Sequence, residues 1–159
     1  MLSGLAKEIG KKQPFAVPAE EAFLNILRTC SILTAQGNRL MRDKGLAEPS
    51  YNILRILRGA GDEGRCGFEI ASHLIAQVPD MTRLIDRLEK LGLLERKRVD
   101  QDRRLVRCFI TKEGLRVLKE IDEPLIGLHK RQFARLSKQQ LDQINELMVL
   151  VRESAKEHE

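Results

Sequence analysis

Positive charge is concentrated in one short stretch of this chain of 159 residues. From Arg83 to Lys112 the sequence contains ten Lys or Arg residues and five Asp or Glu residues, and the resulting charge of +5 equals the formal net charge of the whole chain. A local positive field of this kind is typical of a surface that binds a polyanion. The predicted chemistry of the stretch is therefore recognition of a negatively charged partner.

Catalytic chemistry is not predicted. The sequence shows no evident Ser/His/Asp arrangement, glycine-rich phosphate loop or pair of carboxylates, so we expect no enzyme and no cofactor. Its three cysteines, Cys30, Cys66 and Cys108, form no Cys-x-x-Cys motif, and they indicate neither a disulfide framework nor a metal site. Cys30 is expected to be a buried core thiol, with a redox-active thiol as the alternative. Cys108 follows Arg107, and this cation predicts a lowered pKa for the thiol.

The composition limits the remaining classes of protein. One Tyr and no Trp argue against a protein that binds single-stranded nucleic acid by stacking on bases. No apolar run approaches the roughly 18 residues that span a membrane, and the N-terminus has no apolar signal region. We therefore expect a cytoplasmic protein without a membrane partner.

A helix is predicted to present part of the positive charge. An apolar face and a polar face both recur there at steps of three and four residues. The apolar face contains Met81, Leu84, Ile85, Leu88 and Leu91, and the polar face contains Asp80, Arg83, Arg87 and Lys90. Pro79 is expected in the first turn, where its missing N–H costs nothing, and Gly92 is expected to end the helix in the left-handed conformation.

A two-stranded hairpin is predicted directly after this helix. Residues 93–99 and 105–111 are rich in strand-forming side chains and flank a polar connector at 100–104. Further helices are predicted at 20–44, from Glu48, at 68–74, at 112–136 and from Ser137, which forms a capping box with Gln140. Pro124 is expected to kink or split the helix at 112–136.

Four motifs in this part of the chain resemble those of the MarR family of bacterial regulators. They are TRLIDRLE at Thr82–Glu89, GLLER at Gly92–Arg96, an Asp-x-Arg at Asp102–Arg104, and ITKEG at Ile110–Gly114. The resemblance implies a mainly α fold with a small β-hairpin wing, in which a winged helix-turn-helix is joined to a helical dimerisation region. It divides the chain into an N-terminal arm at 1–19, a dimerisation region at 20–47 and 112–159, and a DNA-binding domain at 48–111.

The resemblance also assigns roles to residues. The start of a recognition helix reads base edges in the major groove, which implicates Gln77, Pro79, Asp80, Thr82, Arg83 and Arg87. In the wing it implicates Asp102, Arg103 and Arg104, with Arg104 entering the minor groove and Asp102 steadying it. Phosphate-positioning contacts are expected from Lys97, Arg98 and Arg107 on the strands.

The expected function is that of a sequence-specific regulator that binds double-stranded DNA. The resemblance implies a homodimeric repressor on a pseudo-palindromic operator, released by a small-molecule effector that binds near Tyr51. Two alternatives remain open from the residues. One is a thiol-based redox regulator that uses Cys30, and the other is a winged-helix module that binds an acidic protein and no DNA.

Overall fold

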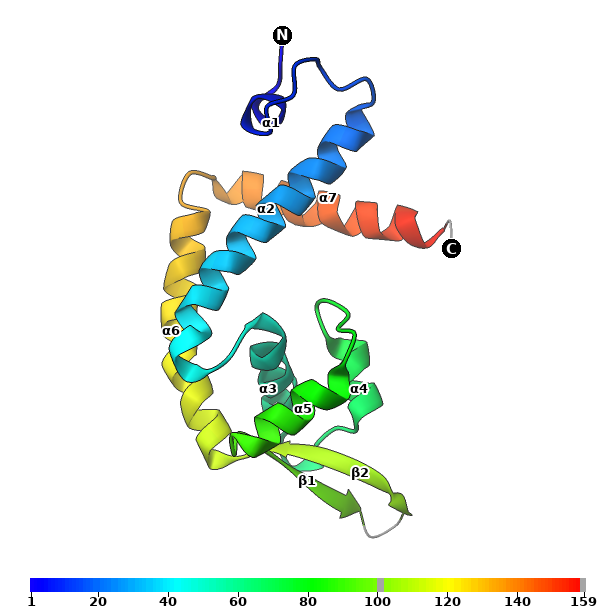
Figure 1. Cartoon of the computed structure of the whole chain (residues 1–159), viewed down its shortest axis with the longest axis vertical. Helices are drawn as coiled ribbons and strands as arrows, with labels where there is room; N and C mark the ends of the chain where they lie inside the picture. The colour runs from blue at the N-terminus through cyan, green and yellow to red at the C-terminus, as the bar shows by residue number, and fades with distance from the viewer. Residues whose placement is uncertain (100–101, 158–159) are drawn as a thin grey trace. The chain divides into compact units, whose positions relative to one another are not determined.

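The chain is mainly helical and contains one β-hairpin (Figure 1). The structure is a computed structural model that describes residues 1–99 and 102–157, with residues 99 and 102–105 described by their backbone only. The elements are α1 (Gly4–Glu8), α2 (Pro18–Met41), η1 (Arg42–Lys44), α3 (Glu48–Ala60), η2 (Gly61–Glu63), α4 (Gly67–His73), α5 (Met81–Lys90), β1 (Leu94–Val99), β2 (Asp102–Ile110), α6 (Lys112–Gln132) and α7 (Lys138–Lys156). The predicted fold class, mainly α with a small hairpin, is confirmed.

The chain divides into two compact units, Met1–Glu123 and Pro124–Glu159. The first unit holds the helix-turn-helix, the hairpin and the start of α6, and the second holds the end of α6 and α7. The division into arm, dimerisation region and DNA-binding domain stays a prediction. None of the described helices is both long and apolar enough to cross a membrane.

The core of the first unit surrounds α3. Its fully buried side chains come from six elements, so that one apolar cluster fixes the helix-turn-helix and the base of the hairpin together. These side chains are Met41, Ile53, Leu54, Leu57, Ile70, Leu88, Leu94, Leu118 and Ile121. The start of α3 has no cap from its own Ala47, and the backbone N–H of Glu48 instead donates to Oδ1 of Asn38 at 2.7 Å. α2 therefore caps α3 through a side chain from outside the helix.

The junction between the hairpin and α6 is set by Thr111 and Gly114. The Thr111 hydroxyl donates to the carbonyl oxygen of Gly92 at 2.7 Å and accepts from the Gly114 N–H at 3.0 Å. A Cβ at Gly114 would lie 2.2 Å from the carbonyl oxygen of Leu93, so only glycine lets α6 begin this close to the hairpin. This close packing explains the threonine and the glycine of the ITKEG motif.

Two predicted boundaries are wrong, and one of the two effects expected of Pro124 is absent. Pro79 lies before the helix, because Asp80 is the N-cap of α5 and its carboxylate supplies the capping bond. β2 starts at Asp102 and not at residue 105, since a strand in an exposed hairpin does not need apolar residues along its whole length. Pro124 does not split α6, which continues to Gln132 because one missing donor removes only one bond of a long helix. Gly92 has a φ of 70° and ends α5 as predicted.

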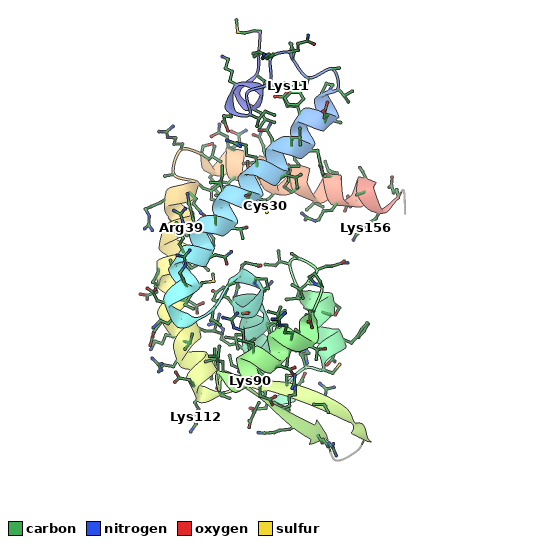
Figure 2. The ribbon with its side chains drawn as sticks, viewed as in Figure 1. Lys11, Cys30, Arg39, Lys90, Lys112 and Lys156 are labelled. Carbon is green, nitrogen blue, oxygen red and sulfur yellow. The ribbon has the colours of Figure 1, made fainter. Side chains whose placement is uncertain are left out.

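Two expectations for cysteines are also wrong. Cys30 is exposed midway along α2 and is not buried within this chain (Figure 2). Cys108 is buried in β2, and this burial raises the pKa of its thiol, outweighing the opposite effect of Arg96. The proximity of Arg107 in sequence was misleading, because Cys108 pairs across the hairpin with Arg96.

Candidate nucleic-acid interface

α5 presents an apolar face to the core and a polar face to solvent. Ile85 and Leu88 are buried, whereas Thr82, Arg83 and Arg87 are exposed. The helix begins at an Asp80 cap, in which the carboxylate accepts the Arg83 backbone N–H at 2.9 Å. Capping therefore occupies Oδ1 of Asp80, one of the residues predicted to read bases, and fixes the first turn on which Arg83 stands.

The cations of α5 differ in what they contact. The guanidinium of Arg87 donates to the carbonyl oxygen of Gly45 at 2.9 Å and so ties α5 to the turn that follows α2 and η1. Among the described residues, Arg83 and Lys90 form no side-chain ion pair, and Lys90 stands at the end of the helix (Figure 2). Arg83 is thus available to a ligand, while Arg87 would have to give up or share an existing bond.

An open hollow of about 470 Å³ lies beside the start of α5. Its lining combines apolar side chains with two guanidinium groups and one carboxylate, from Val78, Pro79, Asp80, Arg83, Leu84 and Arg87. Gln77 is exposed in the loop between α4 and α5 and does not line the hollow. Four of the six predicted major-groove residues are therefore gathered on one surface at the helix start: Pro79, Asp80, Arg83 and Arg87.

The hairpin is regular at its base and irregular toward its tip. Pairing runs from Leu94↔Ile110 to Arg98↔Val106 and then jumps to Val99↔Asp102, which leaves residues 103–105 within the irregular part. The backbone of Asp102, Arg103 and Arg104 lies in β2, and their side chains lie outside the described part of the structure. The predicted roles of these three side chains stay predictions.

One arginine of β1 binds α5 through both its side chain and its backbone. The Arg96 guanidinium contacts Asp86 and donates to Oε2 of Glu89 at 2.8 Å, and its backbone N–H donates to Oε1 of Glu89 at 3.2 Å. The bond to Asp86 is the main cause that raises the pKa of Arg96. α5 and β1 are thereby joined by an ionic network at the junction between helix and wing.

The three predicted phosphate-positioning residues have different surroundings. Lys97 is exposed, pairs with Glu95 at 2.5 Å and stands 5.3 Å above the ring of Phe109. Arg98 is exposed. Arg107 is half-buried and donates to the carbonyl oxygens of Glu63 and Gly64, both at 3.3 Å, so its guanidinium already has partners within the protein.

Tyr51, the expected contact for an effector, is buried and bonded. Its hydroxyl donates to Oδ1 of Asp122 at 2.8 Å, and Asp122 also accepts from Arg58 at 2.5 Å. Burial, followed by the bond to Asp122, raises the pKa of Tyr51 to about 12. The hydroxyl is therefore committed to holding α3 against α6 and is not an open ligand contact.

Comparison with known proteins identifies relatives of this chain. Residues 46–106 match the sequence pattern of the MarR family. The HTH-type transcriptional repressor IacR of Pseudomonas putida is 27% identical over 118 residues, which cover 74% of this chain and 70% of IacR. The crystal structure of a MarR transcription factor from Planctomyces limnophilus is 37% identical, with a TM-score of 0.66 over 86% of this chain and 98% of that one. This chain belongs to the MarR family of transcriptional regulators.

The fold of this MarR-family protein is also that of Sco3205 from Streptomyces coelicolor, which was crystallised in complex with DNA. The two chains are 24% identical, with a TM-score of 0.77 over 90% of this chain and 92% of Sco3205. The family resemblance expected from the four motifs is thus confirmed.

Sequence reasoning expected a cationic partner for Asp86 but did not identify Arg96, which joins α5 to the hairpin. Asp86 and Glu89 are two acids three residues apart on an otherwise basic helix, and Arg96 follows within the next strand. An acidic pair at this spacing lies on one side of a helix and calls for a cationic partner. That signal was present in the sequence, but it could not identify which of the many nearby cations is the partner.

Proposed function

We propose that this protein is a sequence-specific, double-stranded DNA-binding repressor that acts as a homodimer on a pseudo-palindromic operator. The observation that carries the proposal is the exposed start of α5, where Thr82 is exposed and Arg83 lines the hollow, next to a basic hairpin. An exposed guanidinium at this place suits a guanine edge in the major groove. Such a regulator would work in the bacterial cytoplasm.

The homodimer is supported by uncovered apolar side chains on α2. Phe23, Leu27 and Ile32 are each about half exposed or more in the single chain, at 60%, 51% and 48%. In the second unit, α7 also exposes apolar side chains, among them Leu147 and Leu150. Surfaces of this kind mark association, and a two-fold dimer would present two recognition helices about 34 Å apart, in successive major grooves.

Roles within each subunit follow from position and charge. Gln77, Thr82 and Arg83 are the proposed base contacts, and Arg104 at the hairpin tip is the proposed minor-groove contact, with Asp102 and Arg103 beside it. Arg98 and Lys97 are the proposed phosphate contacts, because both are exposed on β1. A small effector would release the operator by binding better to a dimer whose helix spacing does not fit DNA.

Binding to the DNA upstream of the gene, measured over a series of salt concentrations, tests the proposal. Affinity for the DNA site that the protein protects in footprinting (the protected site) should fall steeply with salt, as expected when phosphate contacts release counterions. Arg104→Ala should weaken binding by about 1–3 kcal/mol, and Arg83→Ala should in addition relax the preference for one base. A chain that remains monomeric, or that binds no duplex at low ionic strength, would exclude this function.

Exposure of Cys30 supports a second candidate, a thiol-based regulator. In that case mild oxidation would abolish DNA binding in the natural protein and leave Cys30→Ala unaffected. Equal loss of binding in both proteins would exclude Cys30 as the sensor.

A further inference from the structure

The two strands of the hairpin carry arginines on opposite faces. Arg96 lies opposite Cys108 in the pairing register, whereas Arg107 lies opposite Lys97. Because neighbouring residues of a strand point to opposite faces and paired residues share a face, Arg96 and Arg107 point in opposite directions. Each has partners in a different helix of the helix-turn-helix.

On one face the partner is α5. Arg96 binds Asp86 and Glu89 with its guanidinium, and its backbone N–H binds Glu89 as well. The Arg96 side chain is 29% exposed, which is low for an arginine of a solvent-facing hairpin. The start of the wing is thus fixed to the helix proposed to read bases.

On the other face the partners are η2 and the start of α4. Arg107 donates to two carbonyl oxygens of that segment and reaches Oε2 of Glu69 at 3.4 Å. The Cys66 backbone N–H donates to the same carboxylate at 2.8 Å and is the main cause that lowers the pKa of Glu69. Gly64 has a φ of 59°, and a Cβ there would lie 2.7 Å from the carbonyl oxygen of Cys108, so this segment packs directly on β2.

We propose that Arg96 and Arg107 are positioning residues, which brace the wing on both faces and hold its tip at a fixed distance from α5. They act through the wing and do not themselves contact DNA. Backbone hydrogen bonds of 3.0 and 2.8 Å between Arg65 and Cys108 also hold β2, so loss of one arginine would loosen the hairpin without releasing it. Binding would then have to restrict the added motion at a cost in affinity. This inference rests on the proposed function, because it assigns the braced tip to DNA recognition.

A double-mutant cycle distinguishes bracing from direct contact and from general stability. Arg96→Met and Arg107→Met are each introduced into the natural protein and into Arg104→Ala, and affinity for the protected site is measured. Arg98→Met is the matched control, because it removes the same charge from an exposed position of the same hairpin. Each bracing substitution should weaken binding by roughly tenfold in the natural protein, within the range found for coupled residues. In Arg104→Ala each should have little further effect.

The control should weaken binding by the same factor in both proteins, because a phosphate contact does not depend on the wing tip. Hydrogen exchange of the β1 and β2 amides in the DNA-free protein provides a second measurement, and it should accelerate in both bracing variants and not in Arg98→Met. Arg96→Lys retains the positive charge but not the planar guanidinium that binds two acceptors at once. The cycle is repeated with a lysine variant if a methionine variant does not fold.

Equal factors in both backgrounds, or unchanged exchange in the hairpin, would overturn the bracing role. Failure of the natural protein to bind duplex DNA would instead overturn the proposed function. The exchange measurement still decides in that case whether the arginines brace the hairpin.

Discussion

α2 and α3 both carry regular apolar patterns, but they differ in what covers them. Seven residues of the 13 in α3 are buried, whereas only Gly37 and Met41 are buried among the 24 of α2. Leu54 of α3 is 0% exposed and Leu27 of α2 is 51% exposed. A hydrophobic repeat therefore predicts that one face of a helix is buried, but it does not identify what buries it. For α3 the burying residues belong to the same chain, and for α2, in our proposal, they belong to a second subunit.

The largest expected effect is on stability, at Leu54. Leu54→Ala removes a fully buried side chain from the centre of the core and should lower the free energy of unfolding by about 2–5 kcal/mol. Urea denaturation followed by circular dichroism measures the loss, and Leu27→Ala is the matched control on α2.

The control sharpens the comparison because its loss should depend on protein concentration. Subunit contacts stabilise the folded state by mass action, so the cost of Leu27→Ala should decrease on dilution to the part due to contacts within the chain, whereas that of Leu54→Ala should not change. Equal and concentration-independent losses would mean that the apolar face of α2 is covered within the single chain.

A smaller effect is expected on association, at the exposed face of α2. Leu27→Glu places a charge on the proposed subunit interface and should raise the dimer dissociation constant by roughly 30-fold or more, the effect of losing an interface hot spot. Sedimentation equilibrium measures this constant. Asn25→Glu adds the same charge to an exposed position on the same helix, and it should leave the constant unchanged. A dimer equally weakened by both substitutions would point to general charge repulsion instead of a contact at Leu27.

How much of the molecule the sequence predicts depends on the distance over which each feature is determined. The left-handed Gly92 and the Ser137–Gln140 capping box are set by a few adjacent residues, and both were predicted correctly. The start of β2 was not, because the polar residues Asp102, Arg103 and Arg104 carry no apolar alternation that would identify a strand. Burial of Cys108 also depends on the partner strand and not on its sequence neighbours.

The same distinction holds for the candidate site. The positions of Thr82 and Arg83 at the exposed start of a helix follow from helical periodicity alone. Arg87 binds Gly45, and Arg107 binds Glu63 and Gly64, across separations of 42, 44 and 43 positions in the sequence. No local pattern distinguishes these cations, which already donate to acceptors within the protein, from Arg83, so the sequence predicted a basic surface but not which of its cations are available to a ligand.

A third effect is expected at the contact between the two helices. Asn38→Ala removes the acceptor that α2 supplies to the start of α3 and should cost about 1 kcal/mol of stability, as loss of a helix cap usually does. Thermal and urea unfolding measure the change. Asn38→Asp keeps an acceptor oxygen at the same place and should be tolerated. A similar loss in both variants would indicate that packing of Asn38, and not its hydrogen bond, matters.

The smallest expected effect is a partial shift in the pKa of Tyr51 when its partner Asp122 is replaced. This shift tests whether the polar side chains of the buried helix α3 are also bonded within the protein. Tyr51 is the single Tyr of a chain without Trp, so the ultraviolet absorbance of tyrosinate follows this side chain alone. Its pKa should be about 12, raised by burial first and by the bond to Asp122 second. Asp122→Asn should lower this pKa toward the ordinary value near 10 without reaching it, because burial remains.

The sign of the linked stability follows from the direction of that shift. A pKa raised in the folded state means that the stabilisation is complete below about pH 10 and is lost as the pH rises through about 12. Asp122→Asn should therefore lose less stability than the natural protein over this interval. An ordinary Tyr51 titration in the natural protein would mean that α3 is open to solvent on this side, and the contrast with α2 would then hold for the apolar residues only.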